Sequence, residues 1–117
     1  MRIGIVKERR EYERRVAATP ETVKRYKAMG LEPVVERGAG LGAAISDALY
    51  EQAGARLVDG PGEALAAEIL LKVQRPLDEE LAALGPDQVL IGMLDPYMNR
   101  DQVRAYAERR ITAFALE

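Results

Sequence analysis

Six short apolar runs alternate with amphipathic stretches along the whole chain. The runs cover residues 2–6, 32–36, 55–59, 69–73, 88–94 and 111–116, and each is too short to form a buried helix by itself. Runs of this length are typical of buried strands, and strands that alternate with helices are joined by right-handed crossovers. The pattern therefore predicts an α/β domain with a mainly parallel sheet and helices on both faces, in three layers.

Helix start and stop residues lie between these runs. Thr19 is a good N-cap, Pro20 follows it at the favoured first position, and Gly30 ends the segment. A second helix is expected from Ser46 to Gly54. Shorter helices are expected after Pro61 and over residues 77–84, and a last helix from Asn99, with Gln102 as a variant capping box, to Arg110.

Length and composition fit one domain over residues 1–117. The chain has 48% hydrophobic and 31% charged residues, which excludes the disordered class of proteins. Its net charge of −2 offers no global positive field for nucleic acid or for an anionic membrane surface. The N-terminal apolar run is followed at once by charges, so it predicts neither a signal peptide nor a membrane span, and we expect a cytoplasmic location.

Cysteine and histidine are both absent from the sequence. Disulfides, thiolate nucleophiles, thiolate or imidazole metal sites and imidazole catalysis are therefore excluded. Carboxylate, lysine, arginine and hydroxyl chemistry remains. No carboxylate pair is a candidate for general acid and base, because Asp78, Glu79 and Glu80 fit a solvated helix face and Glu11 and Glu13 lie among arginines.

A glycine-rich segment over residues 38–43 fits the pattern G-x-G-x-x-G/A, and Asp59 follows about twenty residues later. In a dinucleotide site the third small residue already packs inside the helix, whereas the helix signal here starts later, at Ser46. Two interpretations stay open, a turn-forming glycine loop and a phosphate site. The late helix start favours the loop.

Open parallel sheets place their ligand sites beyond the carboxyl ends of the strands. Lys72 ends an otherwise apolar run, so its ammonium must reach solvent, pair with a carboxylate or face a cleft, and Asp95 after the next run is a candidate partner. A structural ion pair and an anion-recognising lysine both remain possible. Arg15 directly precedes the apolar residues 16–18, which suggests that it is held inward.

Four segments together resemble the N-terminal domain shared by alanine dehydrogenase and nicotinamide nucleotide transhydrogenase. They are RIGIVKERREYERRVAATPETV, ERGAGLGAAISDALYEQAGA, LLKVQRP and RRITAFALE, and they span nearly the whole chain in the order of that family. The resemblance implies a flavodoxin-like, Rossmann-related α/β domain, followed in the family by a separate NAD-binding Rossmann domain that this chain does not contain. It also implies that residues 38–43 are not the dinucleotide site of the family.

The resemblance also implies roles for three residues. In alanine dehydrogenases the positions that match Arg15 and Lys72 bind the carboxylate and carbonyl of pyruvate, and a catalytic histidine matches Asp95. Since this chain has no histidine, and since LDPYMNRDQV is more similar to the transhydrogenase α subunit, the transhydrogenase branch is favoured. Arg15, Lys72 and Asp95 are then expected to line an interdomain cleft, and no residue is assigned to catalysis.

Within that branch the resemblance implies the first segment of domain I of a proton-translocating NAD(P) transhydrogenase, which transfers hydride between NAD(H) and NADP(H). The implied partners are a second copy in a homodimer and NADP(H)-binding and membrane-spanning subunits, which would place the chain at the inner membrane as a peripheral protein. NAD(H) is expected in the full-length subunit, and no cofactor in this segment alone. The alternatives are a free-standing α/β binding or interaction domain and an alanine dehydrogenase N-terminal domain.

Overall fold

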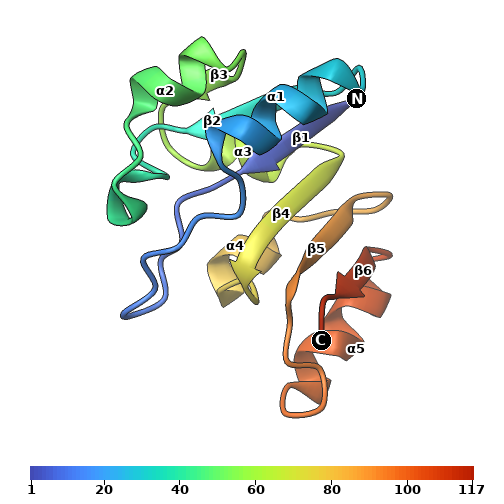
Figure 1. Cartoon of the computed structure of the whole chain (residues 1–117). Coiled ribbons are helices and arrows are strands. Elements are labelled where there is room, and N and C mark those ends of the chain that lie inside the picture. The colour runs from blue at the N-terminus through green and yellow to red at the C-terminus, as the bar shows by residue number, and fades with distance from the viewer.

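The computed structural model describes residues 1–117 as one α/β unit built on a six-stranded sheet (Figure 1). The strands are β1 (Arg2–Ile5), β2 (Glu32–Glu36), β3 (Arg56–Val58), β4 (Ile69–Gln74), β5 (Val89–Met93) and β6 (Thr112–Ala115). They lie in the order β3-β2-β1-β4-β5-β6, and every neighbouring pair is parallel. The expected parallel α/β sheet is confirmed, and the strand order is that of Rossmann domains.

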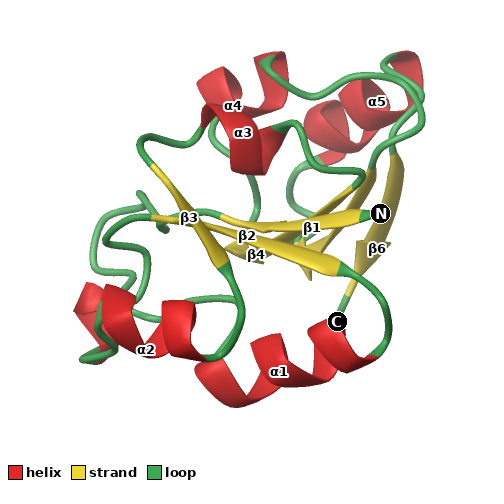
Figure 2. Ribbon diagram, turned by 90° about the horizontal axis from the view of Figure 1, so that it is seen from above, coloured by secondary structure: helices red, strands yellow, loops and turns green.

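Five α-helices cover the two faces of the sheet (Figure 2). Helices α1 (Pro20–Ala28) and α2 (Asp47–Gln52) lie on one face, and α3 (Gly62–Leu65), α4 (Asp78–Ala82) and α5 (Arg100–Glu108) lie on the other. A short 3₁₀ turn, η1 (Leu41–Ala43), precedes α2. The three-layer arrangement expected from the sequence is therefore present.

Each face of the sheet has its own hydrophobic core, because successive side chains of a strand point to opposite faces. In β4, Leu70 belongs to the core under α3, α4 and α5, whereas Leu71 belongs to the core under α1 and α2. Full burial of a leucine contributes about 1.5–3 kcal/mol to the free energy of unfolding. Strands that are buried on both faces explain the continuous apolar runs in the sequence.

Local signals in the sequence set most helix ends. The Thr22 amide donates to Thr19 Oγ1 at 3.2 Å, and the Thr19 amide donates to Thr22 Oγ1 at 2.8 Å, so a reciprocal capping box starts α1. Gly30 follows α1 with φ +88°, a conformation that favours glycine. Ser46 caps α2 as expected, through a bond from the Leu49 amide to its hydroxyl.

The expected capping box at the last helix is wrong. Asn99 does precede α5, but its Nδ2 donates to the Asp95 carbonyl at 2.8 Å instead of its side chain capping the helix. Gln102 donates its Nε2 to the Pro76 carbonyl at 2.7 Å, far from the Asn99 amide in sequence. Both side chains therefore tie together loops at the carboxyl edge of the sheet. The helices show no segment with the length and apolar character that crossing a bilayer requires.

Candidate functional site

Three loops meet at the carboxyl edge of the sheet, because all six strands run in the same direction. They are residues 6–19 after β1, residues 75–77 after β4 and residues 94–99 after β5. Arg15 lies in the first loop, Lys72 lies in β4 near its carboxyl end, and Asp95 lies in the third loop. The three candidate residues therefore share one edge of the sheet.

Lys72 lies between two buried carboxylates. Its Nζ is 3.2 Å from Glu8 Oε1 and 3.2 Å from Glu80 Oε1, and none of the three side chains is more than 4% exposed. We call Glu8, Lys72 and Glu80 the buried triad. A buried lysine ammonium needs such partners, because desolvation of an unpaired charge is costly.

Backbone amides complete the hydrogen bonding of the buried triad. The two Glu8 oxygens accept bonds from the amides of Val73 at 3.0 Å and Gln74 at 3.1 Å. Glu80 accepts a bond from the Leu77 amide at 2.8 Å. The triad therefore joins the loop after β1, the end of β4 and the start of α4, and it fixes the shape of this edge.

Two expectations from the sequence are corrected here. The partners of Lys72 are Glu8 and Glu80, not Asp95, because Lys72 points to the same face as Leu70, where α4 packs. Glu80 is not solvated, since it is 4% exposed and turned inward to that ammonium, although Asp78 and Glu79 are exposed as expected.

Arg15 is also placed differently from the expectation that it is held inward. Its side chain is 63% exposed and its Nη2 lies 2.8 Å from Oε1 of Glu13, whose own side chain is 5% exposed. Glu13 also accepts bonds from the Arg15 amide at 2.9 Å and from Gln74 Nε2 at 2.9 Å. The hydrogen bond from Arg15 lowers the pKa of Glu13 to about 2. The inward-facing member of this pair is thus the carboxylate.

An apolar groove of about 420 Å³ lies beside these residues, on the sheet face that carries α1. Its lining comprises Arg15, Val16, Ala17, Tyr26, Leu71, Lys72, Val73, Ile91, Met93 and Leu116. Two of the three candidate residues, Arg15 and Lys72, therefore share this groove. The Lys72 ammonium is held by the buried triad, so the exposed cation at the groove belongs to Arg15.

Asp95 is not among the residues that line the groove. It is exposed and has φ +46°, a left-handed conformation that aspartate adopts more readily than most residues. Its backbone carbonyl accepts the bond from Asn99, which fixes the loop into α5. The structure brings Arg15 and Lys72 together and leaves Asp95 apart from them.

The glycine loop over residues 38–43 is shaped by packing. A Cβ atom at Gly40 would lie 2.7 Å from Tyr50 Cε2 and 2.8 Å from the Ile45 carbonyl oxygen, so only glycine fits there. The Gly38 amide donates to Asp47 Oδ1 at 2.9 Å, which places a carboxylate of the chain itself where a phosphate would have to accept. Helix α2 begins at Asp47 after the cap Ser46, as predicted, and these residues do not fit a dinucleotide diphosphate.

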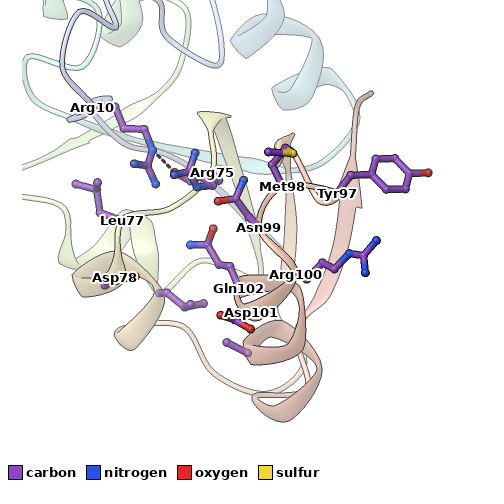
Figure 3. Close-up of a pocket in the computed structure, with 12 residues that line it drawn as sticks. Arg10, Arg75, Leu77, Asp78, Tyr97, Met98, Asn99, Arg100, Asp101 and Gln102 are labelled. Atoms are coloured by element: carbon purple, nitrogen blue, oxygen red, sulfur yellow. Dashed lines mark hydrogen bonds between the residues drawn. The ribbon is translucent and has the colours of Figure 1, made fainter.

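A larger cavity of about 720 Å³ lies between the starts of α4 and α5 (Figure 3). We call it the cationic cleft, because the half-buried Arg10 and Arg75 line one side of it. Arg10 donates from Nε to the Arg75 carbonyl at 3.0 Å and from Nη2 to the Pro76 carbonyl at 3.1 Å. Burial and the charge of Arg75 lower the pKa of Arg10.

Sequence reasoning missed Glu8, Glu80 and Arg10. One signal was available for Glu80: Lys72 shares its strand face with Leu70, and the segment that follows must cover that face. No comparable signal existed for Arg10, because its role depends on how residues 6–19 fold back onto the loop after β4.

Comparison with known proteins adds to this geometry. The family model described as alanine dehydrogenase/PNT, N-terminal domain, matches residues 4–117. The chain is 42% identical over 123 aligned positions to the first of the polypeptides that form NAD(P) transhydrogenase subunit alpha in Rhodospirillum rubrum, covering 100% of this chain and 32% of that protein. It is 36% identical over 117 positions to alanine dehydrogenase of Bacillus subtilis strain 168, covering 100% of this chain and 31% of that protein.

A solved structure gives the same result. The crystal structure of transhydrogenase from Sinorhizobium meliloti superposes with a TM-score of 0.93 at 41% identity, over 98% of this chain and 34% of that chain. This chain therefore spans about a third of the length of the proteins it matches.

Proposed function

Because this chain belongs to the family of alanine dehydrogenase/PNT N-terminal domains, we propose that it is the first segment of domain I of a proton-translocating NAD(P) transhydrogenase. In that role it contributes to hydride transfer between NAD(H) and NADP(H). The observation that carries the choice of branch is the complete absence of histidine, with Asp95 at the position where the resemblance places the catalytic histidine of alanine dehydrogenases. The 42% identity to a transhydrogenase subunit supports the same branch.

The chemistry at Asp95 separates the two branches of the family. An imidazole can exchange a proton near neutral pH, whereas an exposed aspartate stays ionised there. Asp95 also lies outside the groove that Arg15 and Lys72 share, so the three residues do not form one compact site in this domain. An alanine dehydrogenase that relies on this position for proton transfer therefore has no substitute here.

We propose that the domain supplies one wall of an interdomain cleft. Arg15 offers the exposed positive charge, the apolar groove offers the surface beneath it, and the buried triad around Lys72 keeps the edge rigid. Asp95 lines the same edge from the loop after β5. NAD(H) then binds in the full-length subunit, and the segment alone holds no cofactor and transfers no hydride.

The partners follow from the same proposal. They are a second copy of the subunit in a homodimer, an NADP(H)-binding subunit and a membrane-spanning subunit, with this domain on the cytoplasmic side and peripheral to the inner membrane. Direct hydride transfer needs two nicotinamides held in near-attack geometry, and a single 117-residue domain does not enclose both. Nucleic acid is not among the partners.

The test uses the complete reading frame that contains this sequence, purified with any co-purifying subunits. Hydride transfer from NADPH to an NAD⁺ analogue with a shifted absorbance is measured beside alanine-dependent reduction of NAD⁺. Transhydrogenation without alanine oxidation is the expected result. Alanine-dependent NADH formation would assign the alanine dehydrogenase branch, and a reading frame that stops at Glu117 with neither activity would leave a free-standing binding or interaction domain.

A further inference from the structure

We propose that the cationic cleft between α4 and α5 binds a phosphate monoester whose organic moiety carries hydroxyl groups. This inference is independent of the proposed function, since the cleft lies on the sheet face opposite to the apolar groove. It rests on three observations: a pair of converging arginines, two buried polar atoms without partners and the volume of the cavity.

The arginine pair is fixed in place without a carboxylate. Arg10 is anchored by its two bonds to backbone carbonyls of the loop after β4, which leaves other N–H groups of its guanidinium free. The Arg75 guanidinium makes no hydrogen bond or ion pair with any other residue of the chain, and Figure 3 shows it beside Arg10. Two like charges therefore face one cavity with nothing between them to neutralise both.

A dianion is the ligand that matches this charge. A phosphate monoester carries a charge of about −1.5 to −2 near pH 7 and offers three acceptor oxygens, and guanidinium groups bind such oxygens in a fixed fork geometry. A carboxylate would neutralise only one of the two arginines. Burial makes the mutual repulsion of Arg10 and Arg75 costly in the empty cleft, so the binding of a dianion removes an unfavourable interaction.

Two buried polar atoms near the arginines have no hydrogen-bond partner, namely Gln102 Oε1 and the Tyr106 hydroxyl. Gln102 lines the cleft, and its Nε2 is already committed to the Pro76 carbonyl, so its Oε1 faces the ligand side as an acceptor. An acceptor is satisfied by an O–H group and not by a phosphate oxygen. This favours an ester with hydroxyl groups over the free phosphate ion.

Tyr106 supports the same location. It is 3% exposed, and burial raises the pKa of its hydroxyl to about 12, while the nearby charges of Arg75 and Arg10 act in the opposite direction. The hydroxyl therefore lies close to both guanidinium groups, as a donor at the base of the arginine pair. Buried hydroxyls without a partner are uncommon in folded proteins.

The remaining lining limits what else can bind. Asp78 and Asp101 also line the cleft and are exposed, and neither forms an ion pair with the two arginines. Their negative charge disfavours long polyanions such as nucleic acid. The volume of about 720 Å³ accommodates a small organic molecule, within the usual range for such sites.

The experiment compares inorganic phosphate, ribose 5-phosphate and ribose as probes of the ¹⁵N-labelled 117-residue chain. Amide shifts and the Arg75 Nε–H signal are followed by NMR, and affinities are measured by calorimetry. Ribose 5-phosphate is expected to bind about tenfold more tightly than inorganic phosphate, the value of one extra hydrogen bond, and ribose is expected to show no saturable binding.

Two variants locate the site. Arg75→Gln removes a guanidinium that has no partner in the folded chain, so it keeps the fold and is expected to weaken ribose 5-phosphate binding by about 10–100-fold. Arg104→Gln is the matched control, an exposed arginine on α5 that does not line the cleft, and it is expected to bind like the unmodified chain. Equal binding by Arg75→Gln and the unmodified chain, or no saturable binding of either phosphate, would overturn the proposal.

A pH comparison tests the charge match. The second pKa of a phosphate monoester is about 6, and the chain has no histidine to titrate in the same range. The ionisable side chains that face the site are Arg10, Arg75, Asp78, Asp101 and Tyr106. Ribose 5-phosphate is expected to bind more weakly at pH 5 than at pH 7.5, and equal binding would overturn the dianion assignment. Inorganic phosphate as tight as the ester would overturn the role of Gln102 Oε1.

Discussion

Lys72 Nζ lies 3.2 Å from Glu8 Oε1, and both side chains are 1% exposed. With Glu80 as the second carboxylate, this contact joins three loops at the edge of the sheet where ligands bind in folds of this type. The lysine that marks the pyruvate site in the alanine dehydrogenase resemblance is thus, in this domain, the centre of a buried network. Its first role in the isolated chain is structural.

Replacing Lys72 should therefore destabilise the domain strongly. Lys72→Met leaves two carboxylates buried beside each other without a cation, and removal of one partner from a buried ion pair costs about 3–5 kcal/mol. Urea unfolding followed by circular dichroism measures the loss. Lys24→Met, at an exposed position of α1, is the control and should change the free energy of unfolding by less than about 0.5 kcal/mol. A similarly small loss in Lys72→Met would show that the buried triad is not a stabilising network.

The glycine loop provides a second test of the packing argument. Gly40→Ala places a Cβ against Tyr50 and the Ile45 backbone, and overpacking of this kind costs about 1–3 kcal/mol. Gly62→Ala is the matched control, because a Cβ at that helical position meets nothing within 4 Å, and it should be neutral or stabilising by about 0.4–1 kcal/mol. Thermal unfolding of both variants decides, and equal effects would contradict the packing explanation of Gly40.

Stability should also depend on pH through Glu13. Its folded-state pKa is lowered from 4.5 to about 2, first by the hydrogen bond from Arg15. A depressed pKa contributes stability that is fully present above pH 4.5 and is lost as the pH falls toward 2. The urea midpoint of the unmodified chain should fall over this window more steeply than that of Glu13→Gln.

Glu11→Gln is the control for this titration, because Glu11 is exposed. Its urea midpoints should follow those of the unmodified chain across the same pH range. Parallel pH profiles for Glu13→Gln and Glu11→Gln would show that the contact between Arg15 and Glu13 does not hold the carboxylate ionised.

Self-association of the chain is expected from its exposed apolar face. Phe114 is 54% exposed and Leu116 is 67% exposed on the side of the apolar groove, where α1 and α2 pack on β2 and β3 instead. Exposed apolar patches favour association. Sedimentation velocity should show a dimer at high concentration that Phe114→Lys weakens, whereas the exposed control Met29→Lys leaves it unchanged. A strict monomer at every concentration would contradict this expectation.

The sequence predicted the fold well and the site only incompletely, for a physical reason. Apolar runs, Thr19, Gly30 and Ser46 act locally, so the strands and the first helices follow from them. The contacts at the sheet edge join residues about 65 positions apart, such as Glu8 with the backbone of Val73, and no local pattern encodes them.

The charged and polar residues show the same limit. The local spacing predicts that Asn99 caps a helix, yet it bonds back to the Asp95 carbonyl in the loop before the helix. Glu80 belongs to a run of three acids that fits a solvated face, yet the buried Lys72 draws it inward. In both cases a tertiary partner decides between conformations that the local sequence leaves open.

The central claim is that this domain supplies a wall of the cleft and leaves dinucleotide binding to the rest of the subunit. Calorimetric titration of NADH into the folded 117-residue chain tests it most directly. The loop over residues 38–43 commits its Gly38 amide to Asp47 and packs Gly40 against Tyr50, so no saturable heat of binding is predicted. Micromolar binding, about −8 kcal/mol, would contradict the claim and place a dinucleotide site within this chain.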